Sequence, residues 1–101
     1  SPKTNNKQKN RATWGIQIGA FYNRKPAIDI ALKLLKKHPN LLGKGRISIM
    51  PIKKSGYKVL FRARILSISM NAAYRACRLL KRNRKPCMPL RIPLKVEIAS
   101  R

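Results

Sequence analysis

Residues 57–65 read YKVLFRARI, and this stretch carries the clearest periodicity in the chain. Apolar side chains fill every second position: Val59, Phe61, Ala63 and Ile65. The intervening positions hold Lys58, Leu60, Arg62 and Arg64. A period of two is typical of a strand with one buried face. The stretch therefore predicts a strand that places Arg62 and Arg64 on its open face.

The residues before this strand predict its hairpin partner. Ser55 and Gly56 form a turn dipeptide, and RISIMPI at 46–52 is a second strand. Pro51 lacks a backbone N–H, so it confines this strand to a sheet edge or ends it. The pattern leaves the register of this strand open.

A helix is predicted after the hairpin, from Met70 to about Arg82. Ser69 is a suitable N-cap because its hydroxyl can accept from a free backbone N–H. The spacing places one group on the apolar side, Ala73, Ala76, Cys77 and Leu80, and a second group toward water, Arg75, Arg78 and Arg82. Residues 87–90 then leave room for a short strand. The basic run Lys81, Arg82, Arg84 and Lys85 between them fits an anion-binding patch or a solvated loop.

The N-terminal half repeats the order of strand and helix. WGIQIGAF at 14–21 alternates Trp14, Ile16 and Ile18 with small or polar residues, which predicts a strand. A helix over 24–37 follows, with Asn23 as N-cap, Pro26 in the first turn and Asp29 placed to suit the helix dipole. Its apolar face holds Ala27, Ala31, Leu34 and Leu35, and Pro39 ends it.

The order strand, helix, strand, strand, helix, strand predicts an α+β fold. We expect a βαββαβ sandwich of the ferredoxin-like or RNP-like kind, with a four-stranded antiparallel sheet and two helices on one face. Residues 1–13 hold no large apolar side chain and predict a basic flexible linker. The domain spans 14–90, and 91–101 is a tail that forms a short edge addition or is disordered. Because the chain begins with Ser1 rather than Met, we expect a longer parent protein.

The composition limits the classes of partner and of function that fit this chain. The chain of 101 residues has 25 Lys and Arg against only Asp29 and Glu97, a formal charge of +23. This charge predicts an anionic partner: nucleic acid, membrane surface or acidic polysaccharide. Two carboxylates, one histidine and two cysteines provide little material for a catalytic or metal site, so we expect no enzyme, cofactor or metal. His38, at a helix end, is expected to interact with free carbonyls or water.

Several of these stretches resemble the SPOR domain, a bacterial peptidoglycan-binding module. WGIQIGAF is similar to the opening strand of that family, with Gln17, Gly19 and Phe21 at matching positions and Ala20 where Ser is usual. FRARI matches the third strand, and ACRLLKR followed by CMPL matches the end of the domain. The last motifs look like those of SPOR domains appended to alphaproteobacterial serine-type D-alanyl-D-alanine carboxypeptidases, so a longer parent is expected to be such an enzyme.

The resemblance implies a periplasmic, monomeric module that binds glycan strands lacking stem peptides, and so directs a parent envelope protein to the division site. It implies no small-molecule substrate. The family binds with the open face of its sheet, which by position would present Gln17, Ala20, Leu60, Arg62, Arg64 and Met88. The alternation independently places Gln17, Leu60, Arg62 and Arg64 on that face.

Cys77 and Cys87 are ten residues apart, on the apolar side of the second helix and at the start of the last strand. They can meet in the core, as a disulfide in an oxidising compartment or as two buried thiols.

An RNA- or DNA-binding module of the same topology is the alternative function, since +23 suits a phosphate backbone. Such modules stack bases on aromatic side chains of the first and third strands, where this chain has Gln17 and Val59.

Overall fold

The computed structural model describes residues 12–53, 55–56 and 58–93. Its elements follow in the order β1 (Ala12–Phe21), α2 (Arg24–Lys37), α3 (Pro39–Leu42), β2 (Arg46–Lys53), β3 (Val59–Ile68), α4 (Met70–Arg82) and β4 (Met88–Pro93). The strands form one sheet in the order β2-β3-β1-β4, and every neighbouring pair is antiparallel. The predicted α+β fold and the predicted strand and helix order are therefore confirmed.

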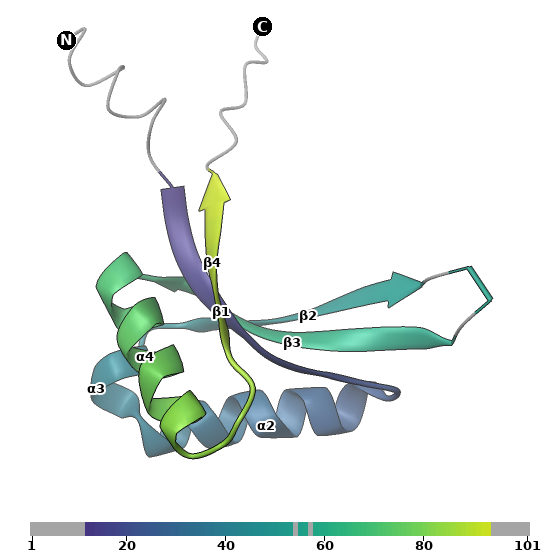
Figure 1. The fold of residues 1–101 in the computed structure, drawn as a ribbon, viewed down its shortest axis with the longest axis horizontal. Helices are drawn as coiled ribbons and strands as arrows, with labels where there is room; N and C mark the ends of the chain where they lie inside the picture. The colour runs from purple at the N-terminus through teal and green to yellow at the C-terminus, as the bar shows by residue number, and fades with distance from the viewer. Residues whose placement is uncertain (1–11, 54, 57, 94–101) are drawn as a thin grey trace, which may run out of the picture.

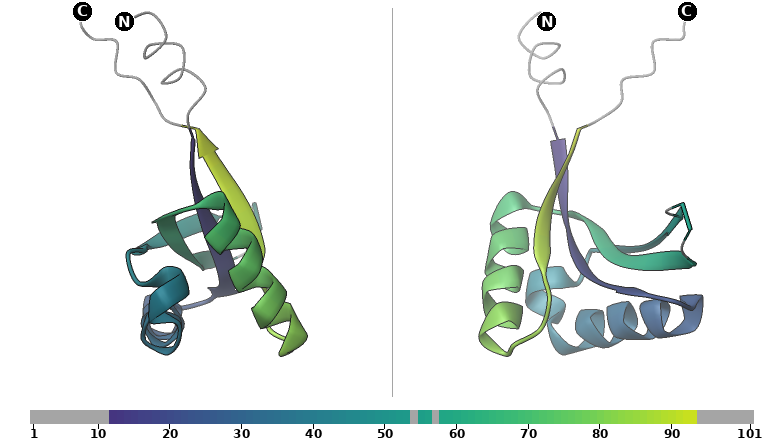
Figure 2. Two further views of the ribbon diagram at one scale, coloured as in Figure 1. Left: turned by 90° about the vertical axis from the view of Figure 1, so that its left-hand side faces the viewer. Right: turned by 45° about the vertical axis from the view of Figure 1, so that its right-hand side comes forward.

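Both long helices pack against the same face of the sheet (Figures 1 and 2). Helix α2 contacts β1 and β3, while α4 contacts β1 and β4. The opposite face carries no helix in the part of the chain that the structure describes, which leaves it available to a ligand. No helix within the described ranges is long and apolar enough to cross a membrane.

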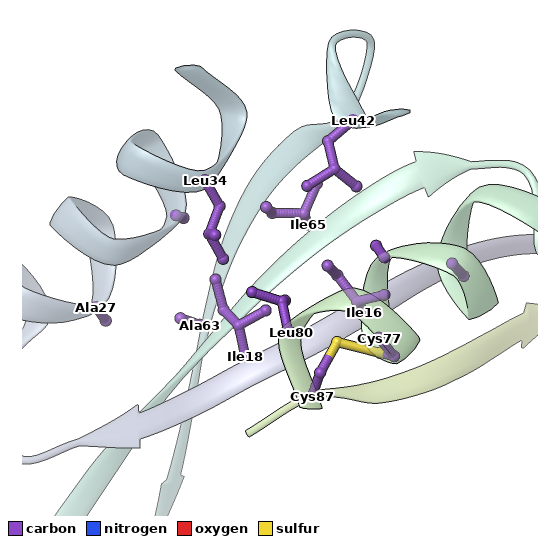
Figure 3. Close-up of a cluster of buried hydrophobic side chains, with 13 residues drawn as sticks. Ile16, Ile18, Ala27, Leu34, Leu42, Ala63, Ile65, Cys77, Leu80 and Cys87 are labelled. Atoms are coloured by element: carbon purple, nitrogen blue, oxygen red, sulfur yellow. A yellow bond between two sulfur atoms is a disulfide. The ribbon is translucent and has the colours of Figure 1, made fainter. Parts of the chain in front are cut away.

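The core lies between the sheet and the two helices (Figure 3). Ile16 and Ile65, from the two central strands, are fully buried beside Leu42 of α3. Small side chains let the helices approach: Ala27 and Ala31 on α2, and Ala73 and Ala76 on α4. The apolar faces predicted from helical spacing are the faces that are buried, except that Leu35 is half-buried.

The helix boundaries agree with the sequence, but the capping differs between the two helices. At α4 the Ser69 Oγ accepts a hydrogen bond of 3.0 Å from the backbone N–H of Ala72, as predicted. At α2 the Asn23 side chain makes no capping hydrogen bond. Asp29 lies beyond the first turn of α2, where it forms an exposed ion pair of 3.1 Å with Lys25 instead of acting on the helix dipole.

The short helix α3 was not predicted. Pro39 ends α2 as expected, but it also occupies the first turn of α3, where its missing N–H costs no hydrogen bond. The backbone N–H of His38 bonds to the Leu34 carbonyl at 3.0 Å and closes α2. The expected contact of its side chain with free carbonyls or water stays a prediction.

Strand boundaries differ from the prediction at both ends of the domain. Strand β1 begins at Ala12, within the predicted linker, and β4 runs from Met88 to Pro93, three residues into the predicted tail. Pro93 is tolerated because β4 is an edge strand, and Pro51 is likewise in the edge strand β2. Most of the predicted linker and tail, residues 1–11 and 94–101, lies outside the described residues.

Candidate functional site

The strand register shows which side chains share the open face of the sheet. Directly paired residues of antiparallel strands point to the same side. Gln17 of β1 pairs with Arg64 of β3 and with Met88 of β4, while Ala20 pairs with Arg62. Leu60 occupies the same face of β3 two residues further along. All six predicted site residues are therefore on one face: Gln17, Ala20, Leu60, Arg62, Arg64 and Met88.

Ala20 reaches this face through an irregularity in β1. Regular alternation puts residues 17 and 20 on opposite faces, but the register shifts between Gln17 and Gly19 and returns Ala20 to the open side. Gly19 has φ +153, and a Cβ there would lie 3.1 Å from ring atoms of Phe21. Glycine is needed at this position because both its backbone conformation and its surroundings disfavour a side chain.

Arg64 is held in place at the centre of the face. Its Nε donates a hydrogen bond of 3.0 Å to the Gln17 Oε1, across the two central strands. Burial lowers the pKa of Arg64, and the positive charge of Arg62 lowers it further. An anion bound here would oppose both effects, because it would stabilise the charged guanidinium.

Arg62 lies beside Arg64 with an unused donor. Its Nε is buried and has no hydrogen-bond partner among the described residues. A buried donor without a partner is unfavourable unless a ligand supplies an acceptor. On one strand the two arginines are about 6.6 Å apart, so one extended anionic ligand can contact both.

The surroundings of this polar centre are more apolar than expected. Met88 is 53% exposed and Met50 is 38% exposed. Half-buried aliphatic side chains complete the open face: Ile52, Leu60, Leu66, Leu90 and Ile92. The arginines and Gln17 thus form a polar centre within an apolar surface, to which the predicted Leu60 and Met88 belong.

Sequence reasoning missed the contribution of β2 to this face. Ser48 pairs with Arg64 and Met50 pairs with Arg62, so both extend the site outward. Ile47 and Ile49 alternate with Ser48 and Met50, and this alternation indicates which side chains share a face. The apolar residues that follow fit either face of the strand, so the pattern did not decide which face meets the helices.

No aromatic side chain lies on the open face within the paired segments that the structure describes. Trp14 lies on the helix side, where its ring centroid is 5.5 Å from that of Tyr74. Val59, compared above with a base-stacking position, shares the helix-facing side of Phe61, and the residue opposite Gln17 is Arg64. The described part of the face therefore has no platform of the kind that stacks bases.

A covalent link fixes one edge of the site, at the start of β4. A disulfide joins Cys77 of α4 to Cys87, immediately before β4, with a Cα–Cα distance of 5.0 Å. It ties the start of β4, and with it Met88, to the helix layer.

No group of three or more possible metal-ligating side chains occurs within the described ranges.

Comparison with known proteins identifies the family. The family profile described as SPOR domain matches residues 10–91. The chain belongs to the SPOR domain family. The match covers every strand and helix except the last residues of β4. SPOR domains are binding modules, which agrees with the prediction that this chain is not itself an enzyme.

This SPOR domain has a structural counterpart in a known peptidoglycan binding domain. No curated protein gives a significant match to this chain. A solution structure of the peptidoglycan binding domain of the B. subtilis cell wall lytic enzyme CwlC is similar over 81% of this chain and 91% of that domain. The two share 18% sequence identity, with a TM-score of 0.49.

Proposed function

We propose that this SPOR domain binds peptidoglycan glycan strands, and that it prefers strands from which the stem peptides have been removed. The observation that carries the proposal is the polar centre of the open face, formed by Gln17, Arg62 and Arg64. It combines an oriented guanidinium with a buried donor that lacks a partner among the described residues.

The chemistry of a stripped strand fits this centre. Removal of the stem peptide leaves each muramic acid with a free lactyl carboxylate, where an intact strand has a neutral amide. Arginine forms paired hydrogen bonds with carboxylates, and each charge-assisted hydrogen bond contributes about 1.5 to 3 kcal/mol. The preference for stripped strands therefore follows from the charge that peptide removal exposes.

The apolar surface around the centre supports a sugar ligand. Sugar rings present C–H faces that can cover exposed methyl and thioether groups, and Met50 and Met88 flank the two arginines on opposite sides. Base recognition has less support because the paired part of the face carries no aromatic side chain.

We also propose the biological setting that this specificity suggests. A module that recognises stripped strands would direct a parent envelope protein to the division site, where such strands collect. The disulfide supports an oxidising compartment such as the periplasm. The similarity of the ACRLLKR and CMPL motifs supports a carboxypeptidase as the parent. We propose that the domain acts as a monomer.

Pull-down on purified sacculi tests the proposal. Sacculi are compared before and after digestion with an amidase, and RNA and duplex DNA are tested at the same salt concentration of about 0.15 M. We expect binding to increase after digestion and to exceed binding to both nucleic acids. Equal or tighter binding to RNA contradicts the proposal.

Matched substitutions separate a specific site from general attraction. Arg62→Ala and Arg64→Ala should each weaken binding to stripped strands by roughly tenfold or more, the equivalent of at least one charge-assisted hydrogen bond. Lys3→Ala and Lys7→Ala remove the same charge from the N-terminal segment and should change it little. If all four variants lose affinity equally, the attraction is diffuse and the site is not specific.

A further inference from the structure

A second cationic surface lies on the outer side of α4. Helix α4 buries Ala73, Ala76, Cys77 and Leu80 against the sheet. Positions 75, 78 and 82 lie within about 60° of one another around the helix, on the side opposite these residues. Arg75, Arg78 and Arg82, here called the α4 arginine stripe, are all exposed and point away from the sheet.

Among the described residues, no acid neutralises the stripe. The only two acidic residues are Asp29, which pairs with Lys25 on α2, and Glu97, which lies outside the described residues. Lys81 and Arg84 are exposed next to the stripe and add to its charge. Its potential is therefore available to an external anion.

The conformation of Arg84 is an independent observation on the same surface. Arg84 and Lys85 close α4 with backbone hydrogen bonds of 2.9 Å to Lys81 and Leu80, the pattern in which glycine is the usual residue at position 84. Arg84 instead adopts φ +63, a conformation that is unfavourable for a residue with a side chain. The chain thus keeps an arginine beside the stripe where glycine would be more stable.

The shape of the stripe distinguishes between possible ligands. It spans about 10 Å along the convex side of a helix, and a shallow groove of about 230 Å³ lies against it, lined by the three arginines with Leu41 and Leu79. Met70 and Tyr74, near the N-terminal end of the helix, are 54% and 48% exposed. Because α4 buries its apolar face against the sheet, a phospholipid surface would be bound mainly through the exposed guanidinium groups.

We propose that the α4 arginine stripe docks on an anionic phospholipid bilayer. The guanidinium forks bind lipid phosphates at the surface of the bilayer. Because the stripe and the open sheet face point in opposite directions, the bilayer and a glycan strand can be bound by one molecule at the same time.

Vesicle sedimentation of the full chain tests this proposal at about 0.15 M salt. We expect binding to phosphatidylcholine vesicles that contain phosphatidylglycerol, and little binding to phosphatidylcholine alone. R75Q/R78Q/R82Q should lower binding by about a hundredfold, since each of the three basic side chains near an anionic leaflet contributes about fivefold. Absence of binding to the anionic vesicles, or equal binding to both kinds, overturns the proposal.

Two control variants separate the stripe from the overall charge of the protein. K33Q/K36Q/K37Q removes three exposed charges from α2 and should leave vesicle binding within about twofold. R75K/R78K/R82K keeps the charge and should retain most of the binding. An equal loss in the α2 variant means diffuse attraction, and a full loss in the lysine variant means that the charge of the stripe does not drive the binding; either result overturns the proposal.

The test is independent of glycan binding. R62Q/R64Q should leave vesicle binding unchanged, and soluble stripped glycan strands should not displace the vesicles. Stripe-dependent binding to polyglutamate without binding to anionic vesicles would instead identify an acidic protein segment as the partner and overturn the membrane proposal.

Discussion

The arginines of the open sheet face and those of α4 are the same residue type in different physical settings. Arg62 and Arg64 are half-buried, and Arg64 is oriented by Gln17 at 3.0 Å. The α4 arginine stripe is exposed on a convex helix surface. Desolvated and oriented cations can distinguish one anion from another through hydrogen-bond geometry, while exposed cations respond mainly to charge density. From this comparison we expect burial to separate recognition from attraction in a chain of such high charge.

The largest expected effect comes from separating the two regions at their covalent link. The disulfide connects α4, which carries the stripe, to the residue before β4, which contributes Met88 to the open face. The double substitution Cys77→Ser/Cys87→Ser opens the loop that the disulfide closes, which has a sequence separation of 10. We expect the free energy of unfolding to fall by about 2 to 3 kcal/mol, measured by urea denaturation.

This double substitution should also weaken glycan binding more than vesicle binding, because the link holds Cys87 next to Met88 of the open face. Unreduced protein is examined by mass spectrometry in parallel. Detection of two free thiols there would show that the native protein has no such link.

Gly19→Ala tests the sheet site alone. The substitution places a Cβ at φ +153 and 3.1 Å from the Phe21 ring, so we expect a loss of about 1 to 3 kcal/mol in stability. Because the irregularity at Gly19 places Ala20 beside Arg62, affinity for stripped glycan should fall as well, as measured by pull-down.

Gly56→Ala is the matched control for this strain. Gly56 has φ +80, but no atom within 4 Å would meet its Cβ, and it lies in the β2–β3 turn. It should lower stability without changing glycan affinity. A Gly19→Ala variant that binds glycan as the wild type does would show that the bulge is not required for the site.

Salt should affect the two regions to different degrees. Interactions of exposed charges are screened over about 10 Å at 0.1 M salt and about 3 Å at 1 M. Between these concentrations we expect vesicle binding to fall by about tenfold more than binding to stripped glycan, because short hydrogen bonds from half-buried arginines are screened less. If both affinities depend equally on salt concentration, the two surfaces bind their ligands by the same kind of interaction.

The smallest expected effect is a gain in stability. Arg84→Gly relieves the φ +63 conformation and should raise the free energy of unfolding by about 1 kcal/mol in thermal or urea denaturation. The same variant should bind anionic vesicles several-fold more weakly and leave glycan binding unchanged. Asparagine tolerates this conformation better than most residues, so Arg84→Asn is a second variant with the same expected direction. Loss of stability in both variants would mean that the arginine side chain makes a structural contact.

The sequence alone determined the four strands and the two long helices of this protein. Alternation in residues 57–65 and helical spacing in 24–37 and 70–82 report the periodicities of strand and helix, which are local properties of the backbone. The same alternation placed Gln17, Arg62 and Arg64 on the open face, as the strand register confirms. Ala20 and Met88 came from the family resemblance, since local pattern did not place them.

Only the tertiary structure decided how these elements form a site. The bulge at Gly19 depends on the pairing of β1 with β3, and the register of β2 depends on which of two equally apolar faces meets the helices. Three features of the site depend on residues that are distant in sequence. They are the apolar surface around the arginines, the hydrogen bond from Arg64 to Gln17 and the burial of the Arg62 Nε. Such contacts leave no periodic signal along the chain, because they are set by packing between strands rather than by the backbone geometry of any one of them.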